Sequence, residues 1–79
     1  MTKNEFIEKI KNAMDCIVFT VHGQGYTILV WPEEGITINE WNSEKEDVFP
    51  TSEALVDGFL VNGIPLGELT NEIIIKDYC

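Results

Sequence analysis

The sequence predicts a small α+β protein with elements in the order α-β-β-β-α-α-β. Three observations predict this class: an amphipathic helical period opens the chain, three β-rich segments separated by glycine-containing turns follow, and a second helical period precedes a last β-branched segment. Blocks of strands and helices that do not alternate are typical of α+β proteins. A chain of 79 residues has room for one core. We therefore expect residues 1–79 to form a single domain.

The first half of the chain predicts one helix and a three-stranded antiparallel meander. Thr2-Lys3-Asn4-Glu5 fits a capping box, and apolar residues then recur at helical spacing, so a helix is expected over about 3–14. β-branched and aromatic residues dominate the three segments that follow, which predicts strands at 16–22, 26–31 and 36–41. Gly23-Gln24-Gly25 and Pro32-Glu33-Glu34-Gly35 supply the turns between these strands.

The second half predicts two helices and a C-terminal strand. Val48-Phe49 should form a short extended piece closed by Pro50. Thr51 or Ser52 can cap a helix over about 52–61, with Gly63 as the left-handed residue at its end. A short helix from Pro65 to about Thr70 and a strand over 73–77 complete the order.

The segment 59–66 has an alternative interpretation as a hairpin. Asn62-Gly63 is a strong signal for a type I′ turn between two strands. Pro65 argues against a paired strand at this place, because proline removes a donor from the ladder. We therefore favour the helix.

The turn lengths predict which side chains share a face of the sheet. A four-residue turn at 32–35 pairs Trp31 with Ile36 and Leu29 with Ile38. With a three-residue turn at 23–25, this register directs the following side chains toward the core: Ile17, Phe19, Val21, Leu29, Trp31, Ile36 and Ile38. The second face then carries Val18, Thr20, His22, Tyr26, Ile28, Val30, Thr37, Asn39 and Trp41. That face is too apolar for full exposure, so we favour one helix on each face, with a partner chain on the second face as the alternative.

The chain is strongly acidic, and the excess is local. Fourteen acidic residues and five lysines give a net charge of −9. Three lysines and two glutamates give residues 1–14 a net charge of +1, which leaves −10 for residues 15–79. Such a chain would repel nucleic-acid phosphates and anionic lipids, so direct nucleic-acid and membrane binding are not expected. The chain lacks an apolar run that could span a bilayer and an apolar N-terminal signal, which predicts a cytoplasmic protein.

No motif in the sequence predicts catalysis, a cofactor or a metal site. His22 is the only histidine and has no evident carboxylate or nucleophile beside it. The G-x-G at 23–25 lies between strands and does not open a helix, and the acidic stretch 39–47 lacks the ligand spacing of an EF-hand. We therefore predict that the protein is not an enzyme and needs no cofactor.

The two cysteines, Cys16 and Cys79, are expected to be reduced structural residues. A disulfide between them would close a long loop and stabilise the chain, but a cytosolic protein would keep both reduced.

These observations predict a non-catalytic acidic module that binds a basic protein surface, as an inhibitor or immunity-type protein would. Acidic side chains would steer the partner and aromatic side chains would supply affinity. The predicted interaction surface consists of Tyr26, Glu33, Glu34, Glu40, Trp41, Glu44, Glu46 and Asp47. The alternative is a homodimer or assembly subunit that buries the second sheet face against its own copy.

In its composition the chain resembles small acidic proteins carried by phages and mobile elements of AT-rich Gram-positive bacteria. The resemblance rests on abundant isoleucine, asparagine and glutamate, on the lack of arginine and on a single compact α+β unit. Some of those proteins inhibit host defence systems. The resemblance therefore implies an inhibitory role.

Overall fold

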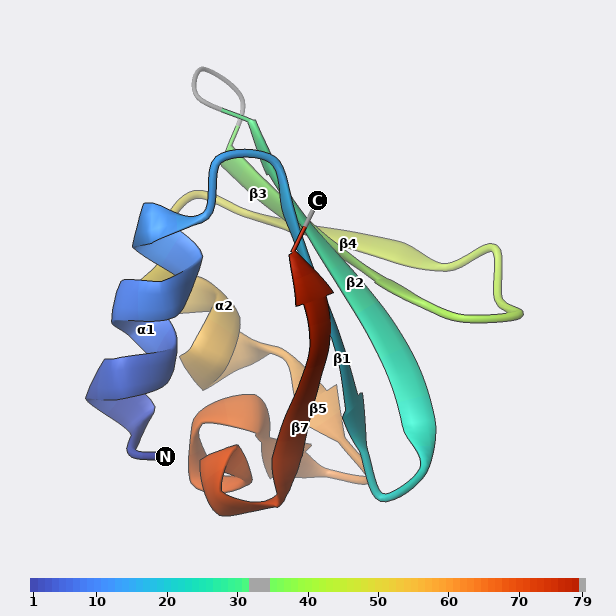
Figure 1. The fold of residues 1–79 in the computed structure, drawn as a ribbon. Helices are drawn as coiled ribbons and strands as arrows, with labels where there is room; N and C mark the ends of the chain where they lie inside the picture. The colour runs from blue at the N-terminus through green and yellow to red at the C-terminus, as the bar shows by residue number, and fades with distance from the viewer. Residues whose placement is uncertain (32–34, 79) are drawn as a thin grey trace.

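The fold is described by a computed structural model that covers residues 1–31 and 35–78. Five strands form one antiparallel sheet in the order β4-β3-β2-β1-β7, and β5 and β6 form a separate small hairpin (Figure 1). The predicted α+β class is confirmed. The elements are α1 (Lys3–Asn12), β1 (Cys16–Val21), β2 (Gln24–Trp31), β3 (Gly35–Glu40), β4 (Glu46–Phe49), α2 (Ser52–Gly58), β5 (Leu60–Val61), β6 (Ile64–Pro65), the 3-10 turns η1 (Leu66–Glu68) and η2 (Thr70–Glu72), and β7 (Ile73–Tyr78).

Helix α1 begins with the predicted capping box. The hydroxyl of Thr2 accepts a hydrogen bond from the Glu5 amide at 3.1 Å, and the Glu5 carboxylate accepts one from the Thr2 amide at 3.1 Å. The hydrogen bond from the Thr2 amide lowers the pKa of Glu5. The helix ends at Asn12, two residues earlier than predicted, because Ala13 already has an extended backbone.

The second helix is shorter than predicted, and the hairpin interpretation of the segment after it is correct. Helix α2 ends at Gly58, and Val61 pairs with Ile64 across a two-residue turn. Asn62 and Gly63 have φ angles of 54° and 83°, the left-handed values that a type I′ turn requires. The Asn-Gly signal therefore outweighs the objection from Pro65, which lies at the end of a two-residue strand, where proline is tolerated.

The remaining elements after the meander follow the prediction with two refinements. The short extended piece at Val48-Phe49 is the end of β4, which pairs with β3 and widens the sheet. The expected helix from Pro65 to about Thr70 consists of the two 3-10 turns. The predicted last strand is β7, which pairs antiparallel with β1.

The register between β1, β2 and β3 differs from the predicted one. The first turn has two residues, because Val21 pairs with Gln24, and Trp31 pairs with Gly35 instead of Ile36. Residues 32–34, which include the predicted turn residues Glu33 and Glu34, lie outside the described residues. A shift of one residue reverses the faces of a strand. Tyr26 and Ile28 therefore face the core, whereas Leu29 and Trp31 face away from it.

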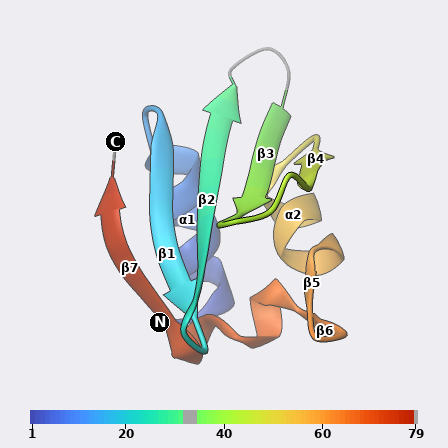
Figure 2. The same ribbon diagram turned by 90° about the vertical axis from the view of Figure 1, so that its right-hand side faces the viewer.

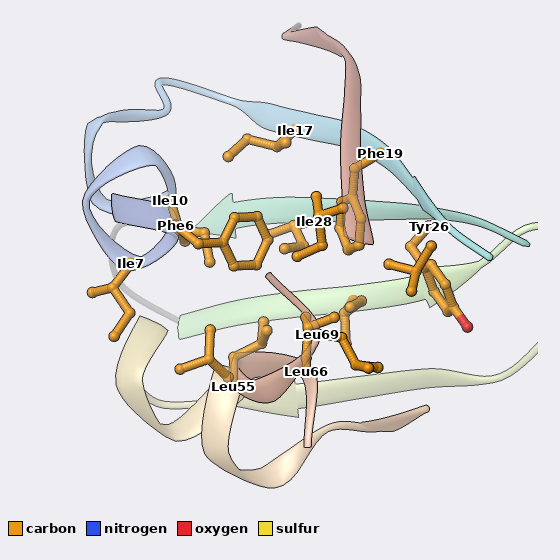
Figure 3. Packing of buried hydrophobic residues seen from close by; sticks show 14 of the residues in the cluster. Phe6, Ile7, Ile10, Ile17, Phe19, Tyr26, Ile28, Leu55, Leu66 and Leu69 are labelled. Atoms are coloured by element: carbon orange, nitrogen blue, oxygen red, sulfur yellow. The ribbon is translucent and has the colours of Figure 1, made fainter. Parts of the chain in front are cut away.

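Both helices pack on the same face of the sheet, which corrects the expectation of one helix on each face. Figure 1 shows α1, α2 and the 3-10 turns on one side of the sheet, and Figure 2 looks onto the other side, with α1 behind the strands. Figure 3 shows side chains from this helical layer meeting Ile17, Phe19 and Ile28 of the sheet. The fully buried members of this core are Phe6, Ile10, Ile17, Phe19, Val21, Ile28, Leu55, Val56 and Leu66. Among the described residues, no helix is long and apolar enough to cross a membrane.

The observed register is tested by truncating two neighbours on β2. Ile28 is fully buried, so Ile28→Ala should lower the free energy of unfolding by about 2–5 kcal/mol. Leu29 is half-buried on the other face, so Leu29→Ala should lower it by only about 1 kcal/mol. Urea unfolding followed by circular dichroism measures both values. The predicted register of the sequence would require the opposite order.

Candidate functional site

Among the described residues, no helix covers one face of the sheet; this face is the first candidate site, and we call it the open face. Trp31 and Trp41 lie at its two ends, with 47% and 41% of their surface exposed. Trp41 rests on Gly25, and Trp31 lies six positions after Gly25 on β2, so the two indoles are about 20 Å apart along the strands. The other side chains on this face are Cys16, which is buried, and Val18, Thr20, Thr27, Leu29, Thr37, Asn39, Glu46, Val48, Ile74 and Asp77.

Both indoles are held in place by threonine hydroxyls of the neighbouring strand. The indole N–H of Trp31 donates to Oγ1 of Thr37 at 3.3 Å, and that of Trp41 donates to Oγ1 of Thr27 at 3.0 Å. Trp41 also lies against the backbone at Gly25, where a Cβ atom would overlap its ring carbons. Two aromatic side chains are thus fixed before any partner arrives, which reduces the entropy lost on binding.

A cleft on the opposite side of the sheet is the second candidate site. It encloses about 500 Å³ between the ends of β2, β3 and β4 and the chain from α2 into the β5–β6 hairpin. Aromatic side chains of Phe49 and Phe59 line it together with several polar ones. The polar lining residues are His22, Gln24, Tyr26, Glu40, Lys45, Asp47 and Asn62.

Tyr26 joins the core to this cleft. Its ring is 4% exposed, stacks on Phe19 with centroids 5.5 Å apart and meets Phe59 edge-on at 5.6 Å. Figure 3 shows its hydroxyl pointing away from the other labelled side chains. Burial raises the pKa of Tyr26, and the nearby charge of Glu40 raises it further.

The structure divides the predicted interaction surface between the two sites. Trp41 and Glu46 lie on the open face, and Glu44 lies exposed in the loop beside it. Tyr26, Glu40 and Asp47 line the cleft. Glu33 and Glu34 lie outside the described residues.

Sequence reasoning missed Trp31, because it placed this residue in the core. It also missed Phe49 and Phe59 as cleft residues. The β4 pairing of Phe49 depends on a contact with β3 that no local pattern encodes. A two-residue turn at His22-Gly23 would have been the signal for Trp31, since it fixes the alternation of β2.

Ion pairs with acids of α2 engage two of the three lysines of α1. Lys3 pairs with Asp57 at 2.5 Å and Lys11 with Glu53 at 3.0 Å. Hydrogen bonding in the second pair raises the pKa of Lys11 and lowers that of Glu53. The two acids of α2 therefore face lysines of α1.

His22 has a structural partner at the first turn. Its Nε2 lies 2.9 Å from a carboxylate oxygen of Glu72, which ties the β1–β2 turn to η2. Cys16 is buried and is bonded in a disulfide, which corrects the expectation that it is reduced, whereas Cys79 lies outside the described residues. Within residues 1–31 and 35–78, no three histidine, cysteine, aspartate or glutamate side chains come together as metal ligands could.

Comparison with known proteins adds no assignment to these two sites. No protein-family model, curated protein or solved structure matches the chain.

The contact of the Trp41 ring with Gly25 is tested by adding one methyl group at Gly25. Gly25→Ala should displace the indole and shift its fluorescence emission to the red, measured in a Trp31→Phe background so that Trp41 is the only tryptophan. The same substitution should cost less stability when Trp41→Leu is also present, because the overlapping ring atoms are gone. An unchanged emission spectrum would show that the ring does not rest on Gly25.

The buried phenol of Tyr26 predicts a loss of stability at high pH. Its pKa is raised in the folded protein, so its contribution is fully present below the unfolded pKa of about 10 and is lost as the pH rises through the folded value. Urea unfolding between pH 8 and 11 should show a steeper decline for the wild type than for Tyr26→Phe. The control Tyr78→Phe, which changes an exposed ring, should retain the wild-type decline. Parallel curves for wild type and Tyr26→Phe would contradict the assignment.

Proposed function

We propose that the protein is a non-catalytic interaction module of the cytoplasm that binds a basic protein through its open face. The observation that carries this proposal is the pair of fixed, half-exposed tryptophans on a sheet face that no helix covers. Tryptophan is enriched among the residues that dominate interface energies. An exposed patch of this kind on a small protein is typical of an interaction surface.

The charge of the chain selects the kind of partner. A net charge of −9 on 79 residues raises the association rate with a basic surface and repels acidic ones. Glu46 and Asp77 lie on the open face itself, and Glu44 is exposed in the adjoining loop. The same charge disfavours nucleic acid and anionic membranes as partners. An inhibitor or immunity-type protein that covers a basic functional surface fits these properties.

The size of the open face favours a large partner over a second copy. Five strands spaced about 4.8 Å apart and a length of about 20 Å give roughly 400 Å². Two copies packed face to face would bury about 800 Å² in total, less than the roughly 1,200 Å² at the lower end of stable interfaces. A basic partner can add contacts to the acidic loop after β3.

The homodimer remains the second candidate function, and two observations favour it. The open face exposes Val48 and Ile74 by 61% and 58%, and strand β7 leaves one edge of the sheet unpaired among the described residues. The two functions differ in their response to salt. Salt screens the repulsion between two acidic copies, whereas it weakens the attraction to a basic partner.

The proposed function predicts capture of a basic protein that depends on salt and on both tryptophans. Immobilised wild-type protein should retain such a partner from a lysate of its own organism at 50 mM NaCl and release it at 500 mM NaCl. Trp31→Ser/Trp41→Ser should weaken binding of the isolated partner at least tenfold by calorimetry, because two anchors are lost.

The matched control is Met14→Ser, which removes a side chain that is 88% exposed and lies outside the sheet. It should bind the partner as the wild type does. Equal binding by the double tryptophan variant would contradict the use of the open face. Self-association in sedimentation experiments that strengthens with salt, with no basic partner retained, would favour the homodimer.

A further inference from the structure

Tyr26, Glu40 and Asp47 are among the cleft residues whose side-chain polar groups have no partner among the described residues. Only 4% of the surface of Tyr26 is exposed, and its hydroxyl makes no hydrogen bond within the described residues. The carboxylates of Glu40 and Asp47 are half-buried and accept neither a hydrogen bond nor an ion pair. The oxygens of these groups keep contact with solvent, because no fully buried side-chain nitrogen or oxygen of the described residues lacks a partner. The cleft therefore presents three oxygen-bearing groups that a ligand can bind in place of water.

The strand register brings these three groups together. Tyr26 on β2 pairs with Glu40 on β3. Asp47 on β4 pairs with Ile38, which lies two residues before Glu40 on β3 and on the same face of the sheet. Glu40 and Asp47 are thus diagonal neighbours, which in antiparallel sheets lie about 7–8 Å apart. A group of a few atoms can lie between two carboxylates at this separation.

The charges in and around the cleft favour a cation. On the helical layer, Lys3 and Lys11 neutralise the acids of α2. Lys45 lines the cleft, but its ammonium group lies within 4.0 Å of no carboxylate that the structure describes. The two cleft carboxylates thus lack the counter-ion that the α2 acids have.

We propose that the cleft binds an organic cation, a primary ammonium or a guanidinium group, between the carboxylates of Glu40 and Asp47 and the hydroxyl of Tyr26. The rings of Phe49 and Phe59 line the same cleft and can contact the cation by their faces. Guanidinium groups bind carboxylates through paired hydrogen bonds. A bare metal ion fits poorly, because Ca²⁺ takes six to eight oxygen ligands and the cleft supplies fewer.

This inference does not require the proposed function. The cleft lies on the side of the sheet that the helices cover, whereas Trp31 and Trp41 lie on the open face. Trp31→Ser/Trp41→Ser should leave the affinity of the cleft unchanged. The failure of one proposal can therefore be told from the failure of the other.

The test is a titration of the ¹⁵N-labelled protein with methylguanidinium and with butylammonium at constant ionic strength. Saturable shifts are expected at the amides of Tyr26, Glu40 and Asp47, with a Kd in the millimolar range, the order that such small ligands reach. Methylurea, the neutral counterpart of methylguanidinium, should bind at least tenfold more weakly. Shifts that do not saturate, or equal binding of methylurea, would overturn the proposal.

Variants separate the cleft from the general acidity of the chain. Glu40→Gln/Asp47→Asn should weaken binding at least tenfold, and Tyr26→Phe about threefold or more. The matched control Glu44→Gln/Glu46→Gln removes the same charge from exposed positions outside the cleft lining and should change the Kd less than twofold. Lys45→Gln should strengthen binding about twofold, because it removes a competing cation. Equal weakening by the control pair would show diffuse attraction and overturn the site.

The head group occurs both on free small molecules and on basic side chains of proteins. The capped peptide acetyl-Gly-Arg-Gly-amide distinguishes these sources. Binding as tight as that of methylguanidinium supports a site for a partner's side chain, and binding at least tenfold weaker supports a site for a free cation. If neither the peptide nor the small cations bind, the proposal is wrong.

Discussion

The two-residue turn at His22-Gly23 is the constraint on which the rest of the molecule depends. Both residues have positive φ angles, 50° and 80°, and the pairing of Val21 with Gln24 sets the alternation of all eight residues of β2. That alternation buries Ile28, directs the Tyr26 ring into the core and leaves Trp31 outside. A turn one residue longer would exchange the two faces of β2. The core, the cleft and the open face are thus consequences of one local geometry.

A second organising feature is the segregation of the helices to one side. The buried apolar residues of α1 and α2 meet the same sheet face, and lysines of the first helix pair with acids of the second. The helical layer is therefore locally balanced in charge. The net charge of the chain therefore lies mainly outside α1 and α2, on the strands, the connecting loops and the 3-10 turns.

Local signals were sufficient for much of the fold. The capping box at Thr2 and Glu5, the β-branched runs and the last strand all lie where the sequence predicts them, because each depends on neighbours in the chain. Errors occurred where two local signals competed or where distant segments had to meet. At 59–66 the Asn-Gly turn competed with a helical period, and β4 joined the sheet through pairing with β3 that periodicity does not reveal.

The candidate sites were less predictable than the fold, because they depend on which face of the sheet each strand residue occupies. Trp41 and the acids near it could be proposed from composition, but the placement of Tyr26 and Trp31 required the turn length to be known within one residue. The gathering of Tyr26, Glu40 and Asp47 needs three strands in correct register. No periodic pattern in a single segment contains that information.

The position of β7 beside β1 also bears on how the protein folds. Among the described residues, the outer edge of β1 is paired only by β7, more than 50 positions further along the chain, and the bulge between Val18 and Phe19 forms only with that pairing. A contact between segments so far apart in the sequence closes a long loop, which makes it slow to form. Until it forms, the meander exposes the unpaired edge of β1, a template for association with other chains. The strand order thus makes completion of the sheet a late step of folding.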